Sequence, residues 1–161
     1  MRALTTLAAL AVAPTLVLAQ ASSGCNNTSV TAQPVAFGNY NPVSPTPSPG
    51  LGTIDVQGSG CGNIANPSVA IALSPGNSGN AAARSMSGPA GARLAYNLFV
   101  DAAYTQVWPA SPATAPRFTL LPAPGNGNRQ VRVPVYARIP AGQTNLRPGA
   151  YSDLIVVEVI Y

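Results

Sequence analysis

Apolar and polar residues alternate with a period of two in several segments of the chain, which is the pattern of β-strands. Beyond residue 21 no segment keeps a helical period, and clusters of Gly, Pro, Asn and Ser separate the alternating segments. Strands are expected at 30–37, 53–57, 69–73, 94–101, 118–121, 131–139 and 151–161, with turns or loops at 42–52, 74–79, 87–91 and 125–128. About seven strands in roughly 140 residues predict an all-β sandwich.

Two prolines fall inside the expected strands, Pro34 and Pro134. Proline has no backbone N–H to donate to a neighbouring strand. We therefore expect both prolines at a sheet edge or at a bulge.

The final expected strand is apolar on both of its faces over residues 154–161. One interpretation is a central strand that is covered on both sides. The other is one side of an unfinished sheet, which a strand from a partner protein completes. Both interpretations fit the pattern.

The first 21 residues have the three parts of a secretory signal peptide. Arg2 supplies the positive start, residues 7–18 the apolar core, and Ala19-Gln20-Ala21 the small residues of a cleavage site, with cleavage after Ala21 or after Ala19. A membrane anchor is the alternative. However, Pro14 interrupts the apolar run, which is shorter than the roughly 20 residues that span a bilayer.

This interpretation divides the chain into a leader at 1–21 and a single exported domain at 22–161, with no membrane span after cleavage. Removal of Arg2 leaves seven of the eight Arg against four acidic residues, a net charge of +3. Because these arginines are scattered along the sequence, we expect no surface for nucleic acid.

The composition argues against most enzyme chemistry. The chain contains no His and no Lys. It therefore cannot form a Ser-His or Cys-His nucleophile pair, a His-ligated zinc site, a Schiff base or a phosphate-loop lysine. We expect no catalytic residue, no cofactor and no metal.

Cys25 and Cys61 are the only cysteines. An even pair in an exported protein typically forms a disulfide, and only one pairing is available here. A catalytic thiol is the alternative, but the chain offers no base to ionise it. Closing a loop of about 37 residues stabilises a fold by roughly 4 kcal/mol in the chain-entropy model.

Several short motifs follow Cys25 in order. The most specific are Tyr-Asn-Leu-Phe-x-Asp at 96–101, Tyr-x-Arg-Ile-Pro-Ala-Gly-Gln at 136–143 and Gly-x-Tyr-Ser-Asp at 149–153. Over residues 25–161 the chain resembles the spore coat protein U domain family, which includes the subunits of archaic chaperone–usher pili.

The resemblance implies an immunoglobulin-like sandwich that lacks its final strand. In such pilins a periplasmic chaperone holds the open groove until the N-terminal extension of the neighbouring subunit fills it at the outer-membrane usher. The resemblance places Leu154, Val156, Val157 and Val159 in this acceptor groove, with the strand at 30–37 as its opposite wall.

The chain departs from the pattern of pilus-shaft subunits in one place. Shaft subunits carry an alternating apolar extension before the first cysteine, which is the strand that they donate. Here only residues 22–24 lie between the expected cleavage site and Cys25, and three residues reach about 10 Å. We therefore expect a subunit that accepts a strand without donating one, which fits the tip of a fibre or a coat protein outside a linear fibre.

The motif residues have two interpretations. Tyr96, Asn97, Asp101 and Trp108 could line a ligand pocket, but aromatic residues on strands more often belong to a core. For Arg138 and Asp153 we expect an ion pair or a turn-fixing hydrogen bond. The motif residues expected to be structural are Tyr96, Asn97, Asp101, Tyr136, Arg138, Tyr151 and Asp153.

Two functional hypotheses follow. The first is an exported structural and adhesive subunit of a surface pilus, which passes through the periplasm and has a chaperone, an usher and a neighbouring subunit as partners. The alternative is a standalone secreted spore-coat or carbohydrate-binding module that does not polymerise.

Overall fold

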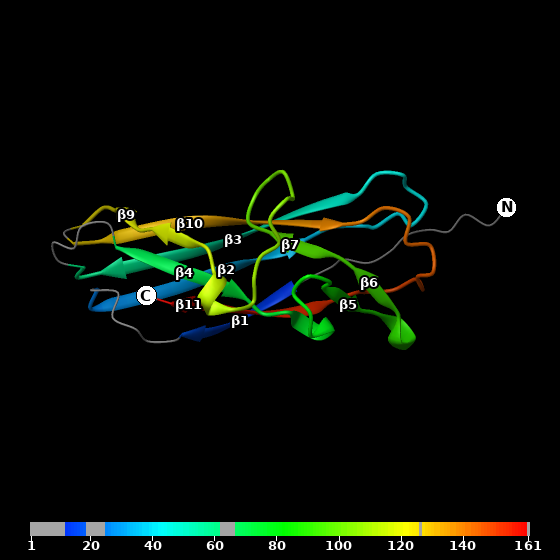
Figure 1. Ribbon diagram of the computed structural model, residues 1–161, viewed down its shortest axis with the longest axis horizontal. Helices are drawn as coiled ribbons and strands as arrows, with labels where there is room; N and C mark the ends of the chain where they lie inside the picture. Colours follow the sequence, from blue (N-terminus) through cyan, green and yellow to red (C-terminus); the bar gives the residue numbers. More distant parts are fainter. Residues whose placement is uncertain (1–11, 19–24, 62–66, 126, 161) are drawn as a thin grey trace.

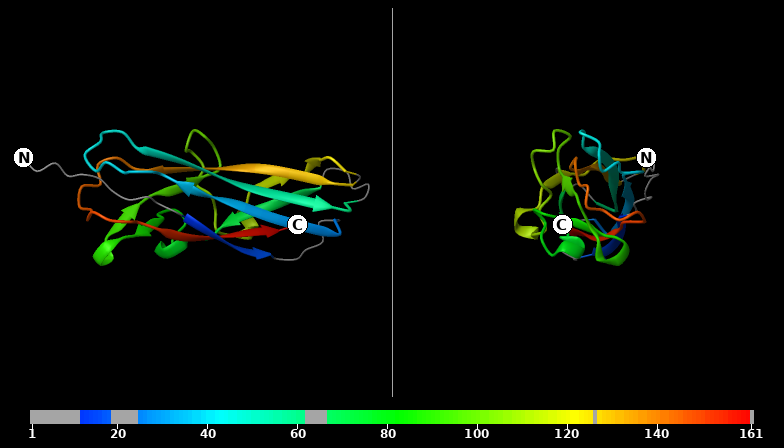
Figure 2. Two further views of the ribbon diagram at one scale, coloured as in Figure 1. Left: turned by 180° about the vertical axis from the view of Figure 1, so that it is seen from behind. Right: turned by 90° about the vertical axis from the view of Figure 1, so that its right-hand side faces the viewer.

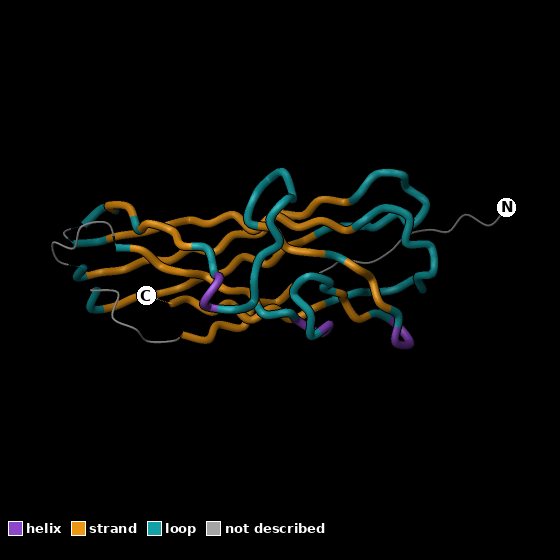
Figure 3. Tube along the Cα trace, in the orientation of Figure 1, coloured by secondary structure: helices purple, strands orange, loops and turns teal. Residues whose placement is uncertain are grey.

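The computed structural model describes residues 12–18, 25–61, 67–125 and 127–160, and for residues 12–18 it describes the backbone. The strands run along the length of an elongated molecule and form two packed layers (Figure 1). The end-on view shows the two layers facing each other (Figure 2). In the described residues, helical structure is confined to short turns between strands (Figure 3). The prediction of an all-β sandwich is confirmed.

The first sheet is built around a long antiparallel pair. β3 (Ser48–Ser59) pairs with β10 (Arg129–Ile139) along the whole length of β10. β2 (Asn27–Ala36) lies on the other side of β3 and forms an edge of the sheet. β7 (Asn97–Phe99) and β9 (Leu121–Pro122) pair with opposite ends of β10.

The second sheet has the strand order β1-β11-β4-β8. β11 (Asp153–Ile160) pairs antiparallel with β4 (Ser68–Leu73), which pairs antiparallel with β8 (Arg117–Thr119). On its other side β11 pairs in parallel with β1 (Val12–Leu18). In Figure 2, β1 (dark blue) and β11 (red) lie side by side.

A hairpin and three short turns complete the described structure. β5 (Ser85–Ser87) and β6 (Arg93–Ala95) form a separate two-stranded sheet. The 3-10 turns are η1 (Gly76–Ser78), η2 (Pro89–Gly91) and η3 (Pro112–Thr114).

The core lies between the two sheets and follows from the alternation of the strands. Trp108 is fully buried, its indole Nε1 donates to the carbonyl of Ile71 at 2.8 Å, and its ring stacks on Phe118 at 6.0 Å between centroids. Burying one large aliphatic side chain contributes about 1.5–3 kcal/mol to the free energy of folding, so the inward row of each strand holds the two layers together.

Both proline expectations are confirmed. Pro34 lies on the edge strand β2, where the register shifts between Gln33 and Ala36. Pro134 lies on β10 between the segments that pair with β7 and β9, so β3 is its only sheet neighbour among the described strands. The missing N–H of each proline therefore breaks no strand ladder.

The loop expected at 42–52 is shorter than predicted, because β3 already begins at Ser48. Residues 48–50 pair with β10, whereas β2 reaches β3 only up to Leu51. Pro49 therefore lies where β3 has a neighbour on one side, a position that tolerates the lost N–H donor.

The single strand expected at 94–101 is also wrong. The segment divides at Tyr96 into β6, which pairs with β5, and β7, which pairs with β10. The apolar alternation continues through the break, because Leu94, Tyr96 and Leu98 are all buried. Alternation therefore reported burial correctly but could not show that the chain changes sheets.

The expected leader falls partly outside the described residues, since residues 1–11 and 19–24 are not described. The described part of its apolar core forms β1. Among the described residues, no helix is long and apolar enough to cross a membrane.

Candidate functional site

The candidate site is the side of β11 that faces β1. The pairing runs from Val12 opposite Asp153 to Leu18 opposite Val159, without a shift in register. β1 also lies next to β2, the edge strand of the first sheet. β1 thus closes the gap between the edges of the two layers.

The backbone polar groups of β11 alternate between its two neighbours. The N–H of Val156 donates to the hydroxyl of Ser74, and the N–H of Ser74 donates to the carbonyl of Val156, both at 2.9 Å. Because successive residues of a strand direct these groups to opposite sides, Ile155, Val157 and Val159 direct theirs toward β1. Without β1 these three residues would present an unpaired strand edge.

The four predicted groove residues lie on two faces of β11. Val157 and Val159 point into the core and are 3% and 0% exposed, and Ile155, which sequence reasoning omitted, lies in the same row. Leu154 is 48% exposed and Val156 is intermediate, so both lie on the outer face. The strict alternation, read from the first inward residue, could have identified Ile155.

The start of β11 is fixed by Asp153, which is almost fully buried. Its Oδ1 accepts from the N–H groups of Asn77 and Leu154 at 2.7 and 2.9 Å. Its Oδ2 accepts from the hydroxyl of Tyr96 at 2.7 Å. The carboxylate therefore fixes a turn, as one of the two expectations for this residue stated.

Arg84 is fully buried beside this carboxylate and was not identified as a site residue from the sequence. Its five N–H groups meet five acceptors at 2.7–3.1 Å. These acceptors are the carbonyls of Leu73, Ser74, Ala81 and Trp108 and the side-chain oxygen of Asn97. Arg84 thus joins β4, which supports β11, to the loop before β5 and to the segment that carries Trp108.

Burial and charge shift the pKa values of this cluster. Burial lowers the pKa of Arg84 to about 10, and the charge of Asp153 opposes the shift. Burial raises the pKa of Tyr96 well above its ordinary value, and the hydrogen bond that Tyr96 donates to Asp153 raises it further. Arg84 is therefore the cation and Tyr96 the neutral donor at neutral pH, which is the arrangement that the hydrogen bonds require.

Tyr151 fixes the approach to β11. Its ring is buried and lies against Gly88, where a Cβ would collide with it. Its hydroxyl donates to the carbonyl of Arg147 at 2.7 Å and accepts from the N–H of the same residue at 3.0 Å. Immunoglobulin-like sandwiches have a similar tyrosine corner before a core strand.

The remaining motif residues do not form one pocket. Asp101 accepts from the N–H groups of Thr105 and Gln106 in an exposed turn, and these hydrogen bonds, led by that from Gln106, lower its pKa. The side-chain oxygen of Asn97 accepts a hydrogen bond from Arg84, and Tyr136 is half-buried on β10. Of the four residues that were considered as a ligand pocket, Asp101 thus lies apart, whereas Asn97 and Trp108 bind Arg84 and Tyr96 binds Asp153.

Arg138 forms no ion pair with Asp153. Its guanidinium lies 4.8 Å from the ring centre of Tyr104 and 5.4 Å from that of Phe99. Such cation–π contacts at partly exposed sites contribute about 0.5–1 kcal/mol. Arg138 therefore holds the 101–106 turn against the outer face of the first sheet.

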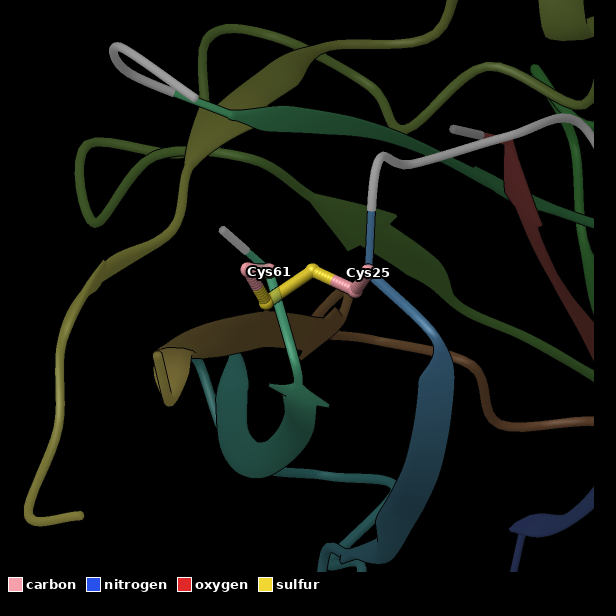
Figure 4. Close-up of a disulfide and its surroundings, with 2 residues drawn as sticks. All are labelled: Cys25 and Cys61. Atoms are coloured by element: carbon pink, nitrogen blue, oxygen red, sulfur yellow. A yellow bond between two sulfur atoms is a disulfide. The ribbon is translucent and has the colours of Figure 1, made fainter. Parts of the chain in front are cut away.

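Cys25 and Cys61 form a disulfide, as predicted (Figure 4). Cys25 precedes β2 and Cys61 follows β3, and Cys61 is fully buried. The bond therefore fastens β2, the edge strand next to β1, to the centre of the first sheet.

A cleft of about 280 Å³ opens near this disulfide. Amide and hydroxyl side chains from three strands line it, including Ser29, Gln57 and Gln130, together with Arg129. The described residues contain no group of His, Cys, Asp and Glu that could hold a metal ion.

Two packed sheets, one disulfide and the paired edge of β11 define a disulfide-bonded β-sandwich domain. The family model of the Spore Coat Protein U domain matches residues 10–158, and the chain belongs to this family. Domains of this family are associated with chaperone–usher pili or spore coats, and the family is a structural or adhesive one of exported or surface proteins. The match begins at residue 10 and thus includes β1. No curated protein matches the chain.

Proposed function

We propose that this protein is an exported structural and adhesive subunit of a chaperone–usher pilus that accepts a partner's strand along β11. One observation carries the proposal: among the described residues, the side of β11 away from β4 is paired only with residues 12–18, which belong to the expected leader. Membership of the Spore Coat Protein U domain family supports the pilus context.

Cleavage after Ala19 or Ala21 would remove all of β1, because both sites follow Leu18. β11 would then be the edge of its sheet, with unpaired groups at Ile155, Val157 and Val159. Such an apolar edge pairs readily with other chains. A chaperone in transit and a neighbouring subunit in the fibre would each cover it by adding a strand.

The same cleavage limits what the mature chain can donate. Cleavage after Ala21 leaves residues 22–24, which extend about 10 Å, whereas a strand of five or six residues spans roughly 17–20 Å. Cleavage after Ala19 leaves 20–24, which contain no large apolar side chain to fill a neighbour's groove. We therefore propose that the subunit accepts a strand without donating one and occupies the fibre tip. Immunogold labelling should mark one end of each fibre, and labelling along the whole length would contradict the tip placement.

Amide hydrogen exchange tests strand acceptance. In the exported protein alone, the amides of Ile155, Val157 and Val159 should exchange quickly, whereas those of Val156 and Glu158, which face β4, should remain protected. Adding the chaperone of the same assembly system should protect the first set and leave the second unchanged.

If all five amides are already protected in the cleaved monomer and no chaperone complex forms, the proposal is wrong. The standalone secreted module would then be the better assignment.

A further inference from the structure

Residues 12–18 belong both to the expected leader and to the second sheet. They belong to the apolar core of the expected leader, and they form the strand that pairs with β11. We propose that the leader segment occupies the acceptor edge of β11 as an intramolecular placeholder, and that its removal opens this edge to the partner's strand. This inference rests on the proposed cleavage and acceptance of a strand.

The pairing covers β11 almost completely. Every residue from Asp153 to Val159 has a partner in β1, and β1 also reaches β2 on the opposite layer. A single segment therefore satisfies the edge of one sheet and closes the gap to the other. A partner's strand cannot pair with β11 while β1 remains in place.

The sequence of this segment suits an edge strand. Val-Ala-Pro-Thr-Leu-Val-Leu contains no charge, and its one proline is tolerated because β1 is the outermost strand of its sheet. The family match independently includes these residues, since it begins at residue 10. Two observations thus place the segment within the domain although it precedes the expected cleavage site.

The register makes a specific prediction about direction. β1 runs parallel to β11, so Ala13 lies opposite Leu154 and Val17 lies opposite Glu158. If β1 ran antiparallel to β11 about the same central pair, Thr15 and Val156, Ala13 would lie opposite Glu158 and Val17 opposite Leu154. Cross-linking can distinguish the two arrangements in the intact chain.

The first experiment uses the uncleaved chain with pairs of cysteine substitutions. Val17→Cys with Glu158→Cys, and Ala13→Cys with Leu154→Cys, should form new disulfides under mild oxidation. The exchanged pairs, Val17→Cys with Leu154→Cys and Ala13→Cys with Glu158→Cys, are the matched controls and should not. Peptide mapping identifies each bond and checks that Cys25–Cys61 is kept, which reports correct folding.

The second experiment tests release. A protease site replaces residues 22–24 of the full chain, which is folded first and then cut. The freed segment 1–21 should stay with the domain in gel filtration, and a synthetic peptide of residues 10–21 should replace it. A scrambled peptide should not bind. Loss of the segment should speed the exchange of the Ile155, Val157 and Val159 amides about tenfold or more.

Equal cross-linking in all four pairs, or cross-linking in the exchanged pairs, would overturn the placeholder. So would immediate loss of the cut segment with no change in exchange. These outcomes can be distinguished from failure of the proposed function. If the placeholder is overturned, a complex of the cleaved protein with its chaperone would still support strand acceptance. If the expected cross-links form but the cleaved protein binds no chaperone, the leader strand is confirmed and the proposed pilus function is wrong.

Discussion

Removing the guanidinium of Arg84 should destabilise the protein more than removing any exposed arginine. In Arg84→Met, the carbonyls of Leu73 and Trp108 lose their donors in the buried interior. Each buried group left without a partner costs about 1–3 kcal/mol. Relief from burying a charge offsets part of this cost, so we expect a loss of roughly 3–5 kcal/mol.

Arg84→Lys separates charge from geometry. Lysine keeps the positive charge near Asp153 but has three donors, whereas Arg84 meets five acceptors. We therefore expect Arg84→Lys to lose stability as well, by about 2 kcal/mol or more. Arg93→Met is the control, because the side chain of Arg93 is exposed and, among the described residues, donates only to the hydroxyl of Ser87.

Urea unfolding of the full chain measures these changes. Trp108 is the only tryptophan and is fully buried, so its fluorescence reports the transition directly. The denaturant midpoint should fall for both Arg84 variants at an unchanged slope. For Arg93→Met, the free energy of unfolding should stay within about 0.5 kcal/mol of the wild-type value. A loss below about 1 kcal/mol for Arg84→Met would refute the reasoning.

Three further predictions follow from the same contacts. Replacing Cys25 and Cys61 together by Ser should cost roughly 4 kcal/mol in urea unfolding, and thiol labelling of the unreduced wild type should fail; labelling of both cysteines would contradict the bond. Tyr96→Phe should lose about 1–2 kcal/mol near neutral pH through the hydrogen bond to Asp153. The pKa of Tyr96 is raised in the folded state, so the stability difference between the wild type and Tyr96→Phe is complete below pH 10.0, the ordinary pKa of tyrosine. It shrinks as pH rises above this value, because Tyr96 then ionises in the unfolded chain first. A stability difference that stays constant across that range would contradict the pKa shift. Gly76→Ala should cost more than Gly79→Ala, since both have left-handed φ angles but only the Cβ at 76 would meet the Asp153 carboxylate; equal losses would show that backbone strain alone decides.

The sequence predicted most of the fold because alternation reports burial. It placed Val69, Ile71 and Leu73 on one face and identified the last strand. It could not locate the break at Tyr96, because the inward positions keep their spacing while the chain passes from β6 to β7. The apolar run at 7–18 fits a leader and a strand equally well, so β1 could be seen only when β11 was placed beside it.

The candidate site was predicted less completely. The disulfide followed from the even cysteine count and the expected export, and a turn-fixing hydrogen bond was one of the two roles expected for the motif residue Asp153. Arg84 was counted among the scattered cations, because nothing in its neighbours along the chain shows that its acceptors come from Leu73, Asn97 and Trp108. Long-range hydrogen bonds of this kind leave no periodic signal.

The long β3–β10 pairing has a consequence for how quickly the chain can fold. Ser48 pairs with Ile139, and β4 pairs with the last strand of the chain, so neither sheet is complete until its last residues are in place. Proteins dominated by such distant pairings fold in milliseconds to seconds, far more slowly than helical bundles. During that time the apolar strands are exposed to aggregation and proteases, which makes early protection as important to this protein as its final stability.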